Sequence, residues 1–210
     1  MIRIIAIERE FGCGESALVE ALAARLRWKL LDQSLTEEVA RIAQVARTVV
    51  EQREGRMDPL FYRLAKVFWH GCYEKGIPVS GQEAFDADRA LALVQQVVRQ
   101  AATEGNCVIV GRGSAYFLRE RTDTLRVFLF APREFKFRFL LSHTQNEAKA
   151  NELLDTVDHN RKMFVKHYLR VEWPHRPSYH AMLNAALGDE LVLATILNLM
   201  DALNKKETPS

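Results

Sequence analysis

The chain has 210 residues, a formal net charge of +2 at neutral pH and a hydrophobic fraction of 48%. This length suits one well-buried core, and so small a net charge argues against nucleic acid as the main partner. No apolar run approaches the ~18 residues of a membrane helix, and no signal peptide is visible, so we expect a cytoplasmic protein without a membrane partner. The three cysteines and six histidines are scattered, which predicts no structural metal.

A strand, a glycine turn and a helix are predicted at the start of the chain. Residues 3–7, Arg-Ile-Ile-Ala-Ile, are rich in β-branched residues and favour a buried parallel strand. The turn at residues 10–14 contains two glycines, and apolar residues then recur at helical spacing over residues 15–27. Residues 30–32 predict a second strand that ends in the carboxylate of Asp32. This order is the first half of a βαβ unit.

Residues 34–103 are predicted to be almost entirely helical and to form an insert between the second and third strands. Ser34 and Glu37 make a capping box at the start of the insert. Its last helix is predicted to run from about Gln82 to Gly105.

The second half of the chain continues the alternation of strands and helices. Residues 107–110 are a continuous apolar run, which predicts a central strand closed by Gly111-Arg112-Gly113. Residues 125–130 predict a fourth strand, followed by a basic helix. The remaining predicted elements are a helix, a fifth strand and a last helix, at residues 146–170, at residues 179–183 and from Gly188 onward. Such alternation is typical of an α/β fold with a parallel sheet covered on both faces.

Four short polar stretches fall at the predicted carboxyl ends of strands, where ligands bind in βαβ proteins. They are residues 8–16, 32–34, 111–113 and 131–133. In the first stretch, the backbone amides from Gly12 through Cys13, Gly14 and Glu15 to Ser16 would lie at a helix N-terminus. Amides in that position can hold a phosphate group.

The first stretch matches a phosphate-binding loop only in part. The full motif, GxxxxGK[ST], adds a lysine for the β- and γ-phosphates and a hydroxyl for Mg²⁺. If Gly14 is the second glycine, Arg9 stands at the first glycine and Glu15 at the lysine, while Ser16 supplies the hydroxyl and a place for Mg²⁺. A two-glycine turn that serves packing alone is the alternative interpretation.

Several motifs, in the same order along the chain, resemble those of the cytidylate-kinase-like family. They are I-A-I-E-R-E-F-G-C-G at residues 5–14, V-I-V-G-R at 108–112, L-R-V-F-L-F-A-P at 125–132, Asp158 and Arg161 with Tyr168, and Trp173, Tyr179 and Asn184. The resemblance implies a three-layer P-loop-type fold with a five-stranded parallel sheet of order 2-3-1-4-5. It also implies one domain over residues 1–210, with the insert at 34–103 binding the nucleoside monophosphate and a lid at 133–172.

The resemblance further implies roles for individual residues. Arg112 would hold the acceptor monophosphate, Arg161 would contact the transferring phosphate beside Asp158, and Asp32 would face the acceptor. A planar guanidinium grips phosphate oxygens bidentately, which suits both arginines. From the residues alone, Asp32 could instead cap a helix and Arg161 could belong to a solvated face. An arginine between two glycines after a core strand has no such packing explanation.

The leading hypothesis is a nucleoside-monophosphate-kinase-like phosphotransferase that uses ATP with Mg²⁺ and takes CMP as its acceptor. Its partners would be small-molecule nucleotides, and a homodimer stays open. A second hypothesis is a catalytically degraded relative that binds a nucleotide or protein as a regulatory or structural module. A third is kinase chemistry on a different small molecule.

The acidity of the loop region bears on the choice between these hypotheses. This chain has Glu8 and Glu15 where the family carries serine and glycine, and Glu10 adds a third carboxylate. Two like unit charges at 4 Å cost roughly 4 kcal/mol at an effective dielectric near 20, and about 1 kcal/mol in bulk water. We therefore expect weaker nucleotide binding than in a P-loop kinase with the lysine.

Overall fold

The computed structural model describes residues 1–14, 17–31 and 87–206. Glu15, Ser16 and Asp32 lie outside the described residues, and so does the predicted insert as far as residue 86. The three described ranges contain a five-stranded sheet and helices on both of its faces.

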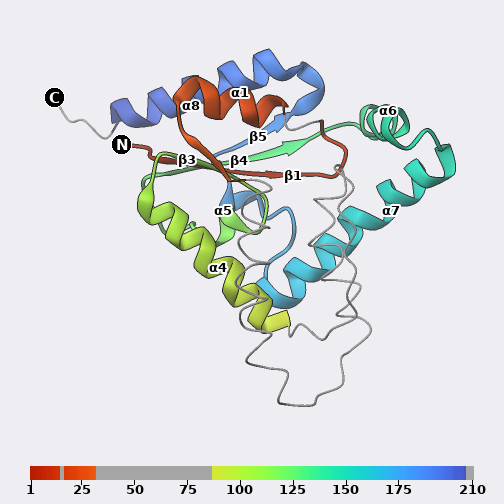
Figure 1. Ribbon diagram of the computed structural model, residues 1–210, viewed down its shortest axis with the longest axis horizontal. Helices are drawn as coiled ribbons and strands as arrows, with labels where there is room; N and C mark the ends of the chain where they lie inside the picture. Colours follow the sequence, from red (N-terminus) through yellow and green to blue (C-terminus); the bar gives the residue numbers. More distant parts are fainter. Residues whose placement is uncertain (15–16, 32–86, 207–210) are drawn as a thin grey trace.

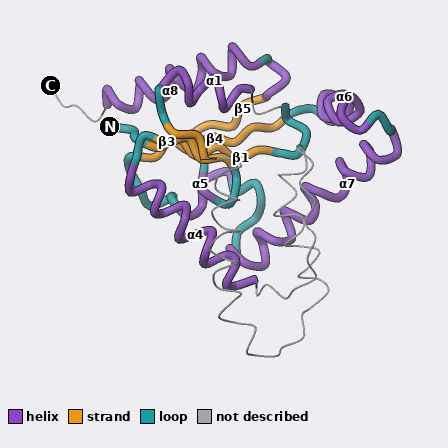
Figure 2. The backbone as a smooth tube through the Cα atoms, viewed as in Figure 1, coloured by secondary structure: helices purple, strands orange, loops and turns teal. Residues whose placement is uncertain are grey.

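The five strands are parallel and lie in the order β2-β3-β1-β4-β5 (Figures 1 and 2). They are β1 (Ile4–Arg9), β2 (Lys29–Leu31), β3 (Cys107–Val110), β4 (Thr124–Phe130) and β5 (Ala181–Asn184). This order confirms the one implied by the family resemblance. The fifth strand begins two residues later than predicted, and Tyr179, which precedes it, packs against Phe128.

Helices follow the strands as the sequence predicts. They are α1 (Ala17–Leu26), α4 (Ala87–Glu104), the short α5 (Ser114–Phe117), α6 (Arg133–Thr144), α7 (Glu147–Phe164) and α8 (Asp189–Lys206). The side chain of Asn146 caps α7 by accepting from the Lys149 amide. The predicted helix at 146–170 is α7 continued by a π-helical turn, Val165–Leu169. Within the described ranges, no helix has the length and apolarity that a membrane crossing requires.

The helices cover both faces of the sheet, so the fold has three layers (Figure 1). Side chains of β1 alternate between the faces, as expected of a central strand. Ile5 and Ile7 pack in a cluster with residues of α1 and α8, whereas Ile4 packs with residues of α4 and α5. All three isoleucines are fully buried, and removing one down to alanine should cost about 2–5 kcal/mol.

A third apolar cluster fastens the segment after α7 to the sheet. The ring of Phe128 in β4 lies 5.5 Å from that of Trp173 and 5.1 Å from that of Tyr179, centroid to centroid. Tyr168 packs at the margin of the same cluster, beside Phe164. These aromatic residues pack in one cluster on the sheet. They hold residues 164–179 close to the carboxyl ends of the strands.

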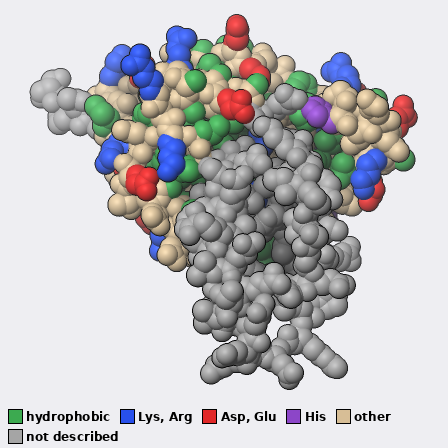
Figure 3. Space-filling model, viewed as in Figure 1, with side chains coloured by type: hydrophobic (Ala, Val, Ile, Leu, Met, Phe, Trp, Pro, Cys, Tyr) green, Lys and Arg blue, Asp and Glu red, His purple; other side chains and the backbone are tan. Residues whose placement is uncertain are grey.

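The charged side chains of the described part are mixed on the face shown in Figure 3. Lysine and arginine lie among aspartate and glutamate over the helices of this face, without a field of one sign. This pattern agrees with the small net charge of the chain. A concentration of arginines at the carboxyl edge of the sheet is therefore a local feature.

Candidate functional site

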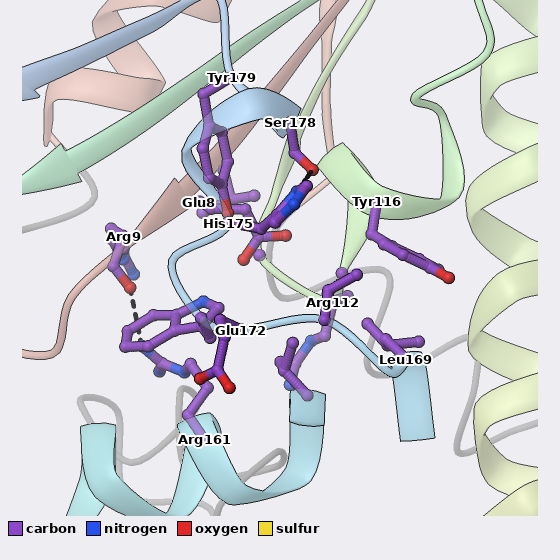
Figure 4. A pocket seen from close by; sticks show the side chains of 16 residues that line it. Glu8, Arg9, Arg112, Tyr116, Arg161, Leu169, Glu172, His175, Ser178 and Tyr179 are labelled. Carbon is purple, nitrogen blue, oxygen red and sulfur yellow. Dashed lines mark hydrogen bonds between the residues drawn. The ribbon is translucent and has the colours of Figure 1, made fainter. Parts of the chain in front are cut away.

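A cavity of about 80 Å³ lies where the carboxyl ends of β1 and β3 meet the segment that follows α7 (Figure 4). Its described walls come from residues 8–9, from residues 110–116 and from residues 161–179. Small-molecule sites usually start near ~300 Å³. The described walls thus enclose room for one end of a ligand, such as a phosphate group.

The turn after β3 presents Arg112 to this cavity. Gly111, Arg112 and Gly113 all have left-handed backbones, with φ of 68°, 61° and 70°. An L-residue pays roughly 1–2 kcal/mol for this conformation, and residues so strained gather at functional sites. The flanking glycines allow the turn, and a Cβ on Gly113 would come within 3.2 Å of the Phe117 ring. The predicted residue Arg112 is therefore the middle residue of a tight, strained turn that lines the cavity.

Arg161 and Asp158 fasten α7 to the start of the glycine turn. The Nη1 of Arg161 donates to the carbonyl oxygen of Arg9 at 2.7 Å and to Oδ1 of Asp158 at 3.0 Å. Both carboxylate oxygens of Asp158 accept from the amide of Phe11 at 3.0 Å. Figure 4 marks the contact between Arg9 and Arg161. We call this set of contacts the α7 clasp.

The clasp holds the charged side chains of Asp158 and Arg161 where few water molecules can reach them. Burial raises the pKa of Asp158, against the opposing effect of Arg161 and the Phe11 amide. Burial likewise lowers the pKa of Arg161, and the neighbouring Asp158 and Glu8 oppose that change. A guanidinium stays protonated even so. The carbon of that guanidinium lies 5.3 Å from the centre of the Trp173 ring, which further favours the cation.

Glu8 carries a buried carboxyl in the same cavity. The residue is 6% exposed, and its Oε1 has no hydrogen-bond partner in the described structure. Burial raises the pKa of Glu8, whereas Arg161, the Ala115 amide, Arg112 and the Ser114 amide act in the opposite direction. From the sequence, this carboxylate was expected only to burden the loop; the structure puts it between two arginines.

The glycine turn itself is packed on one side and open on the other. Gly12 and Gly14 have φ of 79° and 113°, and a Cβ on Gly12 would approach that of Lys136 to 3.2 Å. A Cβ on Gly14 would meet no atom of the described residues within 4 Å. The buried Cys13 thiol donates to the Leu129 carbonyl at 3.8 Å, and burial raises its pKa to about 12. Of Cys13, only the backbone can meet a ligand.

Lys136 is a residue of this region that sequence reasoning missed. Its Nζ lies 2.7 Å from Oε2 of Glu10 and 3.9 Å from Oδ2 of Asp158. Lys136 thus neutralises the charge of Glu10, so Glu10 should repel a phosphate at the glycine turn less than the sequence predicts. Lys136 falls in the predicted lid at 133–172, yet nothing in its spacing distinguishes it from the other basic residues there.

The structure brings together most of the described residues predicted for the site. Arg9, Arg112 and Arg161 line one cavity, and Asp158 lies behind them in the clasp. Gly12, Cys13 and Gly14 follow directly along the chain, between β1 and α1. Within the described ranges, no group of three or more His, Cys, Asp and Glu side chains is placed to hold a metal ion.

Comparisons with known proteins agree with this architecture. A sequence model of the cytidylate kinase-like family matches residues 4–186. An uncharacterized protein from Eubacterium ventriosum is similar in structure, with a TM-score of 0.65, 17% identity and coverage of 96% of this chain and 99% of that one. Shikimate kinase from Acinetobacter baumannii, solved in complex with shikimate, has a TM-score of 0.51, 18% identity and coverage of 96% and 94%. Shikimate kinase from Bacteroides thetaiotaomicron has a TM-score of 0.50, 16% identity and coverage of 96% and 98%.

At such identities the structural likeness shows the fold alone. A comparison with curated protein sequences finds no match.

Proposed function

Because the chain belongs to the cytidylate kinase-like family, we propose that it is a phosphotransferase that moves the γ-phosphate of ATP to a nucleoside monophosphate, with CMP as acceptor. The fold and family are kinase-like. One observation carries the proposal: arginines from three separate elements line one cavity at the carboxyl edge of a parallel sheet. Ligands bind at this edge in open α/β sheets.

Each arginine has a task in such a transfer. Catalysis of phosphoryl transfer consists mainly of positioning and of positive charge on the phosphates. Arg112, held out by its strained turn, would grip the acceptor phosphate. Arg161, half-buried against the Trp173 ring and held by Asp158, would face the transferring phosphate in a place where water screens little. A hydrogen bond to a charged group contributes about 1.5–3 kcal/mol.

The turn before α1 suits the triphosphate of the donor. Gly14 leaves open space on its exposed side, so that phosphate oxygens could approach the backbone closely. Mg²⁺ is commonly held by one or two protein oxygens together with substrate phosphates and waters, and the Ser16 hydroxyl would be the protein ligand here. When bound, the ion would supply positive charge to the phosphates.

The second hypothesis, a degraded relative, has an observation of its own. The α7 clasp already occupies the Phe11 amide and the Arg9 carbonyl with side chains of this chain. In addition, Glu15 stands where a phosphate-binding loop has lysine. On this hypothesis the clasp is structural, and the protein binds a nucleotide or a protein partner without transferring phosphate.

A coupled kinase assay with ATP, Mg²⁺ and a panel of nucleoside monophosphates separates the two. The proposal expects turnover that is highest with CMP and that falls at least tenfold in Arg112→Ala, with Arg27→Ala as the matched control. A thermal-shift panel run in parallel reports binding, because stabilisation grows as RT ln(1 + [L]/Kd). Stabilisation by nucleotides without turnover of any acceptor would favour the degraded relative. If the protein shows neither turnover nor stabilisation by any nucleotide, the phosphotransferase proposal is refuted and the second hypothesis keeps only its protein-partner form.

A further inference from the structure

Glu8 leaves a hydrogen-bonding group unused inside the candidate site. The side chain lines the cavity and is 6% exposed, and Oε1 accepts no hydrogen bond within the described structure. A buried polar atom without a partner costs about 1–3 kcal/mol. Native proteins leave few buried polar atoms without a partner, so this atom calls for one. A ligand group that enters the cavity would remove it.

The groups around this carboxyl come from every wall of the cavity. From β1, the turn after β3, α7 and the segment before β5, the charged and titratable lining residues are Arg9, Arg112, Arg161, Glu172, His175 and Tyr179. Two of the arginines act directly on the Glu8 carboxyl. Burial, followed by the charge of Glu8, raises the pKa of the Tyr179 hydroxyl, which therefore stays neutral. The positive charge of this set would attract an anion to Glu8.

A phosphate group in this place can only accept hydrogen bonds from Glu8. An ionised carboxylate has no proton to donate, and at 4 Å it would repel each unit of phosphate charge by roughly 4 kcal/mol at an effective dielectric near 20. A neutral carboxyl removes that repulsion and offers one O–H donor. Burial acts toward the neutral form by raising the pKa of Glu8, and the charges of Arg161 and Arg112, which oppose it in the free protein, would be offset by a bound phosphate.

We propose that Glu8 binds the acceptor phosphate as a neutral carboxylic acid, donating its O–H to a phosphate oxygen that Arg112 and Arg161 also hold. A proton from solvent joins Glu8 when the phosphate enters, and it returns to solvent when the phosphate leaves; no covalent bond changes. The inference rests on the proposed function, since it needs a phosphate monoester in this cavity. It makes Glu8, a departure from the family's serine, a part of the binding site.

The test is calorimetric titration of the protein with CMP between pH 7 and pH 9, in buffers of high and low ionisation enthalpy. The second pKa of a phosphate monoester is about 6, so proton uptake in this range comes from the protein. We expect wild-type protein to take up protons and to lose affinity as the pH rises, by up to tenfold per pH unit above the pKa of free Glu8. Glu8→Gln keeps a donor and cannot titrate, so it should bind at least as tightly, without the uptake attributed to Glu8.

Glu104→Gln, at the opposite edge of the sheet, is the matched control and should behave as wild type. Thermal unfolding of each variant shows that it is folded. If Glu8→Gln binds CMP tenfold more weakly at pH 7, or if its pH dependence equals that of wild type up to pH 9, Glu8 acts as a charged residue and the inference is wrong. Either result would leave the proposed function standing. If no variant binds CMP at any pH, the proposed function fails, and this inference fails with it.

Discussion

Replacing Arg112 by glycine should separate the stability of the β3 turn from its function. The residue adopts φ of 61° between two glycines that are also left-handed. Glycine takes this conformation without the steric cost that an L-side chain pays. The guanidinium that lines the cavity is lost at the same time. The variant should therefore fold as well as wild type and bind the acceptor poorly.

The two effects differ in size. Relief of the left-handed conformation contributes roughly 1–2 kcal/mol, and the greater freedom of glycine in the unfolded chain takes back about 0.5–1 kcal/mol. The free energy of unfolding should thus rise by up to about 1.5 kcal/mol. The lost charge-assisted hydrogen bonds should cost about 1.5–3 kcal/mol of binding, which weakens acceptor binding by roughly tenfold to a hundredfold.

Arg27 provides a matched control. It is also an arginine with a left-handed backbone, φ of 57°, but it is exposed and lies at the amino edge of the sheet, before β2. Arg27→Gly should change the unfolding free energy similarly and leave CMP binding unchanged. Urea unfolding and calorimetry measure the two quantities. An Arg112→Gly variant that loses more than about 2 kcal/mol of stability, or that binds CMP as wild type does, would refute the reasoning.

Three further predictions concern charges of the loop region. Glu15→Lys should tighten ATP binding roughly tenfold to a hundredfold by calorimetry, because it replaces a repulsion by an attraction; an unchanged Kd in a folded variant would argue against a triphosphate at this loop. Burial raises the pKa of Glu8 above its ordinary 4.5. The neutral carboxyl therefore contributes fully to the free energy of unfolding below pH 4.5, and this contribution is lost as the pH rises through the folded-state pKa. Glu8→Gln should therefore be more stable than wild type in urea at pH 8, and equal stability there would count against the shift. Lys136→Ala should lower the free energy of unfolding by about 1–3 kcal/mol, since the side chains of Lys136 and Glu10 are only 15% and 25% exposed. Lys149→Ala should lower it by at most about 0.5 kcal/mol, because Lys149 and Glu152 are 51% and 60% exposed. Equal losses in urea unfolding would show that burial does not set the difference.

The sheet could be predicted because its strands leave a local signal. A parallel strand covered on both faces is a continuous apolar run, as residues 107–110 show, and its end is marked by the glycines around Arg112. The resemblance to the family supplied the strand order. The start of β5 could not be read from the sequence in this way. Tyr179 is a residue type common in strands, but it lies before β5 and packs against Phe128.

The α7 clasp could not be predicted in the same way. Arg161 and the carbonyl that it contacts are 152 residues apart, and Lys136 and Glu10 are 126 residues apart. Helical periodicity tells which side chains share a face, but it does not identify the partner of that face. The π-helical turn Val165–Leu169 was missed for a related reason, since an extra residue in one turn changes the face without changing the composition.

The position of β1 has a consequence for how the protein is made. This strand is synthesised before the other four strands but lies between β3 and β4, and α1 packs against α8, which follows β5 (Figure 1). At about 5–20 residues per second, the ribosome needs roughly 10–30 s after α1 to deliver the residues of α8. Until β3 has been synthesised, β1 has no partner strand. Until α8 has been synthesised, Ile5 and Ile7 are covered by only part of their final cluster. A nascent chain released before Asp189 would have α1 alone on one face of its sheet, and the apolar residues that α8 covers would stay exposed to chaperones.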